Sequence, residues 1–325
     1  MFQTKNRFRV NWFQECTLSA IADVRFLPQT RFEHVETRFD VEYGVYWAFM
    51  NPRATPCFSL QLLEELRGYI DTIVDNNCEM THKGQKYQIN YGVLASRLPG
   101  VFNLGGDLVL FRFAIASGDR GLLIEYGEKC IDDLFPWHRN CDLPMTTFSL
   151  VQGDALGGGF EAALSATVLV AEESARMGFP EILFNLFPGM GAYSFLSRKI
   201  GRRAAEEMIT SGTIYGARQL YDMGVVDVLT PDGTGEVAIY SYIRKHAKAA
   251  NGRRAFERVR TEIAPITRKE LVQVVEIWAD AALRVQDRDL RMMERLIRAQ
   301  QRTAETALIK TASNVVPMWM AGTGD

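Results

Sequence analysis

The 325-residue sequence has few of the residues that build disulfide frameworks or metal sites. Its five cysteines are odd in number and never spaced as CxxC, and its four histidines are scattered, which argues against a disulfide framework and a zinc site. No apolar run is long enough to span a bilayer, and the N-terminus carries charges where a signal peptide has an apolar core. We therefore expect a cytosolic protein without a metal and without membrane insertion.

The sequence also lacks a strong charge of one sign. Its formal net charge is −2, which argues against a nucleic-acid binder and against an acidic tail. Hydrophobic residues make up 47% and charged residues 23%, the composition of an ordinary globular protein that can bury a sizeable core.

Strand and helix signals alternate through the middle of the chain. Alternating β-branched and aromatic residues over 31–51 predict strands with a turn near Gly44, and apolar spacing of three and four over 59–77 predicts a helix beginning near Ser59. The same criteria predict, in order, a strand at 86–96, a helix at 110–137 weakened at Gly118 and Gly121, a strand at 145–153, a loop then a helix from 154, a strand at 167–174, and helix, turn and strand over 216–231. This alternation indicates an α/β layered core with parallel pairings.

After about residue 235 the strand signals fade and helical spacing dominates. We predict a separate C-terminal helical module that ends in a loose tail over 315–325.

Three consecutive glycines at 157–159 follow a predicted strand and precede a predicted helix. Glycine lets a ligand approach the main chain closely, and the first N–H groups of a helix are unpaired and lie at the positive end of its dipole. Such a turn can hold a developing negative charge on one of its amides. The alternative is a glycine-rich turn used only for close packing.

A second glycine turn, LGGD at 104–107, precedes another predicted helix. Asp107 can cap that helix, and Gly106 can offer a second amide, since an oxyanion hole needs two converging donors. Taken alone, this segment is better explained as a plain N-cap turn.

Two glutamates stand in apolar surroundings, Glu161 just after the glycines and Glu181 twenty residues later in a PEI segment. Burial raises the pKa of a carboxyl, which suits it to general acid–base chemistry. For either glutamate alone, a position at a helix edge facing water is the simpler interpretation.

Together, these elements resemble the crotonase superfamily, whose members share the enoyl-CoA hydratase/isomerase fold, over roughly residues 35–250. The stretches LGGD and ALGGGFE resemble the two turns that supply the family's oxyanion-hole amides, here Gly106 and Gly158. Glu161 and Glu181 match the two carboxylates of the family's hydratases. The stretches FPGMGAYSFLSRKIG and SGTIYGARQLYDMGVVDVL resemble two further family segments. The resemblance implies an α/β crotonase (ClpP/crotonase-like) spiral of ββα units.

Within the superfamily the chain looks most like the diffusible signal factor synthases (RpfF-type). The extended N-terminus, the long helical tail and the stretches LGGGFEAALS and PEILFNLFPGMGAYSFLSR carry this likeness. FNLGGD replaces the usual alanine-rich turn, and Phe160 stands where a smaller residue is usual, which bears on the acyl carrier that is accepted. The likeness implies three parts: an N-terminal extension (1–34), a catalytic core (35–250), and a C-terminal helical oligomerisation or lid module (251–325).

By resemblance, the substrate is a 3-hydroxyacyl thioester carried by acyl carrier protein or CoA, and no cofactor is needed. The Gly106 and Gly158 amides hold the enolate oxygen, Glu181 acts at C2, and Glu161 acts at the hydroxyl or water. Dehydration followed by thioester hydrolysis releases a free cis-2-unsaturated medium-chain acid. A covalent serine route is not expected, because no Gly-x-Ser-x-Gly elbow is present. We expect the acyl chain to contact Leu156, Gly157, Met190 and Trp278, for which ordinary core packing is the alternative.

Four basic residues form a cluster near the expected mouth of the site: Arg198, Lys199, Arg202 and Arg203. This basic cluster suits binding of a phosphopantetheine arm or of an acidic carrier protein. A helix face exposed to solvent explains the cluster equally well. The resemblance also implies a sensor kinase's receiver domain as regulatory partner, and a homotrimer or hexamer. Two other functions remain open: a CoA-dependent enoyl-CoA hydratase or isomerase, and a non-catalytic binding or regulatory protein on the same fold. Retention of both glutamates in apolar surroundings, where they cost free energy, argues against the second.

Overall fold

The computed structural model of the chain describes residues 26–27, 32–52 and 55–314. Most of the expected N-terminal extension (1–34) and the whole predicted tail (315–325) lie outside these residues.

Within the described residues the largest sheet has seven strands, and its central pairings are parallel, as predicted. All residues of its central strands β3, β8 and β10 are buried, which is typical of a parallel sheet covered on both faces. The strands lie in the order β1 (Phe26–Leu27), β2 (Val35–Asp40), β3 (Val45–Met50), β6 (Tyr91–Ser96), β8 (Thr146–Val151), β10 (Val168–Glu172) and β13 (Val228–Thr230).

A second sheet has four strands, and a short hairpin stands apart from both sheets. The four strands lie in the order β12 (Ile214–Gly216), β11 (Arg176–Gly178), β9 (Gly153–Leu156) and β7 (Gly100–Asn103), and the hairpin pairs β4 (Glu79–His82) with β5 (Gln85–Gln88). The predicted strand over 86–96 is therefore two strands in different sheets, because the chain turns at Ile89 and Asn90.

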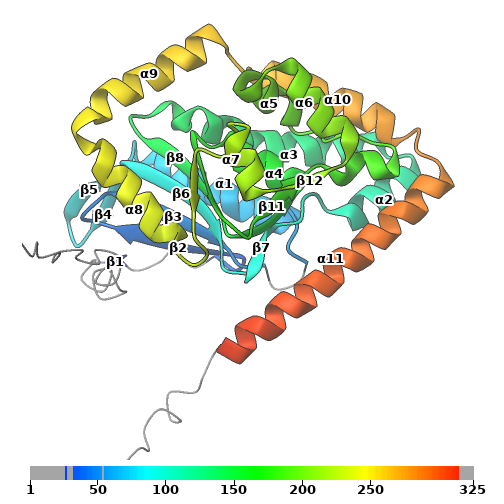
Figure 1. Cartoon of the computed structure of the whole chain (residues 1–325), viewed down its shortest axis with the longest axis horizontal. Helices are drawn as coiled ribbons and strands as arrows, with labels where there is room; N and C mark the ends of the chain where they lie inside the picture. The colour runs from blue at the N-terminus through cyan, green and yellow to red at the C-terminus, as the bar shows by residue number, and fades with distance from the viewer. Residues whose placement is uncertain (1–25, 28–31, 53–54, 315–325) are drawn as a thin grey trace, which may run out of the picture.

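The chain repeats one unit: a strand in the large sheet, a strand in the small sheet, then a helix. β6 leads to β7 and then to α2 (Leu108–Ser117) and α3 (Arg120–His138), and β8 leads to β9 and then to α4 (Gly158–Ser165). β10 leads to β11 and the 3₁₀ turn η3 (Pro180–Phe184). This is the spiral of ββα units that the family resemblance implies, and Figure 1 shows the helices arranged around the two sheets.

Local signals explain most helix boundaries. The Ser59 side chain accepts from the Leu62 N–H at 3.2 Å and caps α1 (Leu60–Asp75), as predicted. The predicted helix over 110–137 breaks at Gly118, which has a φ of 68°, whereas Gly121 lies inside α3.

The prediction of a loop from residue 154 is wrong, because residues 154–156 pair as part of β9. The remaining helices before residue 250 are η2 (Asn140–Asp142), α5 (Ala192–Ile200), α6 (Arg202–Ser211), α7 (Ala217–Asp222), α8 (Gly235–His246) and η4 (Ala247–Ala249).

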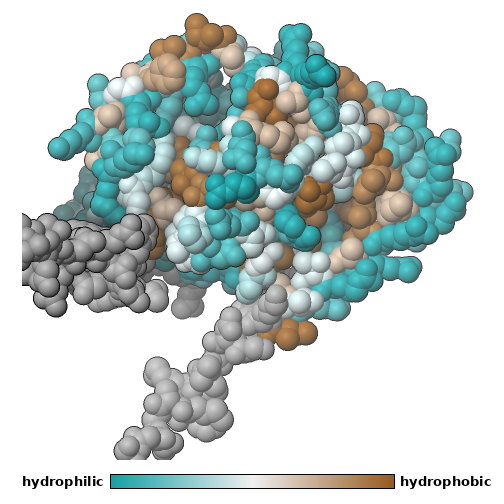
Figure 2. Space-filling view, viewed as in Figure 1, coloured by the Kyte–Doolittle hydropathy of each residue, from teal (hydrophilic) through white to brown (hydrophobic). Residues whose placement is uncertain are grey.

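The C-terminal part is helical, as predicted, and consists of α9 (Ala250–Ile263), α10 (Arg268–Ala282) and α11 (Asp287–Asn314). α10 packs on α3, and α11 runs past η3 and α2 before its last turns project from the body (Figure 1). α9 leaves Phe256, Val259 and Ile263 exposed, and apolar residues gather at its outer end in Figure 2. Within the described residues, none of the helices combines the length and the apolar character needed to cross a membrane.

Candidate active site

Three neighbouring strands of the small sheet position the site. β7 pairs parallel with β9, and β9 pairs parallel with β11, so their carboxyl ends meet at one edge of the sheet. The segment after β7 carries the LGGD turn, the segment after β9 carries the three glycines, and the segment after β11 carries Glu181. Sheet pairing therefore brings together three segments that lie far apart in sequence.

The two glycine turns touch each other. A methyl group built on Gly158 would lie 3.3 Å from the Gly106 nitrogen, and one built on Gly105 would lie 3.2 Å from the Gly158 nitrogen. Gly105 has a φ of 100°, a conformation that side chains rarely adopt. Among the described residues, neither the Gly106 nor the Gly158 amide donates to a protein acceptor. Both glycines line one cavity, so two unpaired N–H donors stand at its wall.

Side chains hold the LGGD turn in place. Asp107 caps α2 by accepting from the Val109 and Leu110 N–H groups at 3.1 and 3.0 Å, so the N-cap predicted for it is present. The Tyr126 hydroxyl accepts from the Asp107 N–H at 3.2 Å and donates to the Phe58 carbonyl at 2.6 Å. These bonds fix the backbone that presents Gly106.

Glu161 stands in the first turn of α4 and is 1% exposed. Its Oε1 accepts from the Met190 N–H at 2.8 Å and from the Ala192 N–H at 3.0 Å. Burial raises the pKa of Glu161 to about 7, and the two amides limit this rise because they stabilise the carboxylate.

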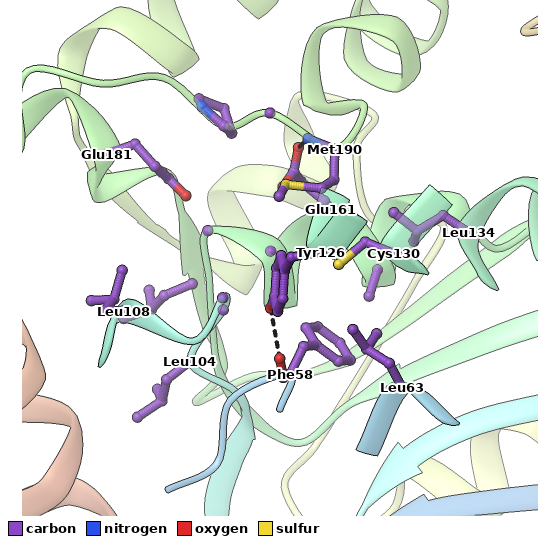
Figure 3. A pocket seen from close by; sticks show the side chains of 18 of the residues that line it. Phe58, Leu63, Leu104, Leu108, Tyr126, Cys130, Leu134, Glu161, Glu181 and Met190 are labelled. Atoms are coloured by element: carbon purple, nitrogen blue, oxygen red, sulfur yellow. Dashed lines mark hydrogen bonds between the residues drawn. The ribbon is translucent and has the colours of Figure 1, made fainter. Parts of the chain in front are cut away.

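Glu181 lies in η3 and points into the same cavity (Figure 3). The residue as a whole is half-buried, but its Oε2 is buried and has no hydrogen-bond partner, so its carboxyl does not face water. Burial, and secondly the negative charge of Glu161, raise the pKa of Glu181 to about 8. A methyl group on Gly157 would lie 2.3 Å from Glu181 Oε1, so only glycine leaves room for this carboxyl.

The cavity has a volume of about 170 Å³ and a mainly apolar wall. Among the described residues that line the cavity, none is a lysine, an arginine or a histidine. Each residue proposed for the acyl site lines it, namely Leu156, Gly157, Met190 and Trp278. The Trp278 ring, carried by α10, packs against the Phe111 ring with 4.9 Å between the ring centroids. Trp278 therefore both packs in the core and lines the cavity.

The basic cluster lies outside the described lining of the cavity, and its position near the mouth stays a prediction. Arg198 pairs with Glu270 on α10 and Lys199 pairs with Asp227, so two of the four charges are engaged in ion pairs. Arg202 and Arg203 are exposed, and no member of the cluster lines the cavity.

Sequence reasoning missed the wall contributed by α3 and α11. Tyr126, Cys130, Asp133 and Trp137 of α3 line the cavity, as do four residues of α11: Leu296, Ala299, Gln300 and Thr303. The available signal was the helical spacing of the α3 residues, which places an aspartate on an otherwise apolar face.

Comparison with known proteins agrees with this geometry. The sequence model of the enoyl-CoA hydratase/isomerase family matches residues 48–293. The chain is 39% identical over 194 residues to the enoyl-CoA isomerase/hydratase fer4 of Mycosarcoma maydis, covering 59% of this chain and 67% of that protein. It is 32% identical over 147 residues to human mitochondrial methylglutaconyl-CoA hydratase, covering 45% of this chain and 41% of that protein.

The chain thus spans less than two thirds of the length of several relatives that it matches. Among solved structures, an enoyl-CoA hydratase from Geobacillus kaustophilus superposes with a TM-score of 0.62 at 18% identity, covering 80% of this chain and 92% of that one. The α/β fold expected from the sequence is therefore confirmed.

Proposed function

This chain belongs to the enoyl-CoA hydratase/isomerase family, and we propose that it catalyses the reversible addition of water to a 2-enoyl-CoA thioester. One observation carries the proposal. Two carboxyls with raised pKa values and two amides without acceptors line a single apolar cavity.

The amides would bind the thioester carbonyl oxygen. Adding water at C3 places negative charge on that oxygen as an enolate, and preorganised N–H donors stabilise it where charge develops. Gly158 is the first residue of α4, so the positive end of the helix dipole adds to this effect. Each such donor lowers the barrier by about 3 kcal/mol.

The carboxyls would move the protons. Glu161, with the lower pKa and two amide donors, takes a proton from water as the oxygen bonds to C3. Glu181, with the higher pKa, retains its proton and gives it to C2. Water thereby contributes its hydroxyl to C3, and C2 receives a proton. The reverse reaction uses the same two groups in exchanged roles.

This assignment predicts a bell-shaped pH profile for kcat/KM, which reports the ionisation of the free enzyme. Activity needs Glu161 ionised, so it rises as pH increases through about 7, and it needs Glu181 protonated, so it falls above about 8. We expect a loss of about tenfold per pH unit on either side. Initial rates of enoyl-CoA hydration, followed by loss of the conjugated thioester absorbance across this range, measure it. A flat profile would show that this pair does not carry the protons.

A second candidate is the synthase expected from sequence, which dehydrates a 3-hydroxyacyl thioester on a carrier protein and then hydrolyses the thioester. The Oε2 atom of Glu181, which has no hydrogen-bond partner, supports this second candidate, because an ionised carboxyl there can activate water next to the bound carbonyl. The relatives named above are hydratases and isomerases, which favours the first proposal.

Supplying 2-enoyl-CoA and 3-hydroxyacyl-carrier substrates side by side separates the two candidates. Reversible hydration without thioester cleavage supports the hydratase, and release of a free 2-unsaturated acid supports the synthase. Absence of both reactions would contradict both proposals.

We further propose that α11 acts as the lid of the C-terminal module. Its Gln300 side chain donates to the Leu104 carbonyl at 2.8 Å, next to the LGGD turn. The Asn185 side chain donates to Asp289 at 3.2 Å and ties the segment after Glu181 to α11. The helix therefore contacts both segments that carry reacting groups.

A further inference from the structure

The cavity continues along α3, beyond the two carboxyls. Tyr126, Cys130, Asp133 and Trp137 recur at helical spacing and all line it, so one face of α3 forms a wall. The stretch from Tyr126 to Trp137 extends about 16 Å along the helix axis. Figure 3 shows Tyr126, Cys130 and Leu134 following one another along this helix, with Leu63 of α1 facing them. An acyl chain whose thioester lies near Tyr126 would therefore run toward Asp133.

Asp133 is the charged side chain on this wall, two helical turns beyond Tyr126. It is only 8% exposed, and both of its carboxyl oxygens are buried without a hydrogen-bond partner. One turn further on, the Trp137 indole Nε1 is also buried without a partner. Buried polar groups are nearly always hydrogen-bonded, and an unpaired one costs about 1–3 kcal/mol. Two such groups on one cavity wall have no protein partner, so a bound ligand can supply hydrogen bonds to both.

The charges around Asp133 limit what that ligand can be. Burial raises the pKa of Asp133 well above its ordinary value, and Asp132 and Asp71 raise it further, while Arg67 and Lys129 oppose this. Arg67 is occupied by Asp71 and by the Asp132 carbonyl. A protonated carboxyl both donates and accepts, and the indole N–H donates.

No cation in the described lining can neutralise a carboxylate at this end of the cavity. A substrate with an anionic tail is therefore disfavoured. A neutral hydroxyl, which donates one hydrogen bond and accepts others, matches Asp133 and Trp137 without bringing in a charge.

We propose that the far end of this cavity selects an acyl chain that carries a hydroxyl group, with Asp133 and Trp137 as its hydrogen-bonding partners. The inference rests on the proposed function for the position of the thioester. It adds a substrate class, the hydroxylated medium-length acyl thioesters, and a specificity residue distant from the reacting atoms.

The test compares matched 2-enoyl-CoA thioesters of increasing chain length that end in a hydroxyl or a methyl group. At the length that reaches Asp133, we expect the hydroxyl-ended substrate to have at least a tenfold higher kcat/KM, because a site built to bind a hydroxyl rejects the analogue that lacks it. Asp133→Leu should abolish or reverse this preference while the methyl-ended substrate retains its kcat. Asp133→Asn, which keeps polar atoms in place, should retain part of it. Asp280→Asn is the matched control, because that exposed carboxylate pairs with Arg120 at the start of α3 and is not among the charges that act on Asp133.

Binding of saturated, unreactive acyl-CoA pairs, measured by calorimetry, separates this inference from the proposed reaction. A hydroxyl preference in binding that Asp133→Leu removes supports the inference even if no hydration occurs. Equal affinity and equal kcat/KM for both ends at every chain length in the wild type would overturn it, whatever the reaction turns out to be.

Discussion

Glu161→Gln and Glu181→Gln each lower kcat for 2-enoyl-CoA hydration by about 10²–10⁴-fold, the usual contribution of a positioned general acid or base. Glutamine has nearly the same shape, and its carbonyl oxygen can still accept the Met190 and Ala192 amides in place of Glu161 Oε1. The loss therefore reports on proton transfer rather than on folding. KM should change little, because neither substitution alters the apolar wall.

The double variant should be little worse than the less active single variant, because the two carboxyls act as a unit. Glu173→Gln is the matched control, since Glu173 is exposed and pairs with Arg218 on the surface. Thermal unfolding of each variant checks that the fold is intact. Full activity in both single variants would exclude these two carboxyls as the groups that transfer the protons.

Gly157→Ala should lower kcat by about 10²-fold or more, because a small misplacement of a reacting group has an effect of that size. The new methyl group would lie 2.3 Å from Glu181 Oε1, so the carboxyl must leave its position beside the substrate. Gly157 also has a φ of 54° and a ψ of −123°, a backbone conformation in which a residue with a side chain adds about 1–3 kcal/mol of strain.

Gly84→Ala separates these two effects. Gly84 has a φ of 78° in the hairpin between β4 and β5, and a methyl group there meets no atom within 4 Å. Chemical denaturation should show a larger loss of stability for Gly157→Ala, which adds the contact with Glu181 to the backbone strain, and only Gly157→Ala should lose activity. An equal kcat in the two variants would show that the working position of the Glu181 carboxyl does not require a glycine at position 157.

The site residues could be predicted from sequence because their signals are local. Glycines before a helix, an aspartate that caps α2 and a proline before Glu181 are each recognisable within a few residues. Their convergence was implied by resemblance, since it depends on the pairing of β7, β9 and β11, which links residues about 75 positions apart.

Other features depend on tertiary packing that a local pattern does not contain. Asp133 stands on an otherwise apolar face of α3, and only the packing of α1 against α3 shows that this face lines a cavity. Arg198 and Lys199 look like a docking surface until Glu270 and Asp227 pair with them. The strand at 154–156 looks like a loop because its neighbours are contributed by β7 and β11.

A crystal structure of the Glu181→Gln variant with a bound 2-enoyl-CoA tests the central claim most directly. We predict that the thioester oxygen lies about 3 Å from both the Gly106 and the Gly158 nitrogens. Glu161 should then stand over C3, the substituted side chain at position 181 over C2, and the acyl chain should run along α3 toward Asp133. A thioester bound elsewhere, or contacting only one of the two amides, would contradict the account.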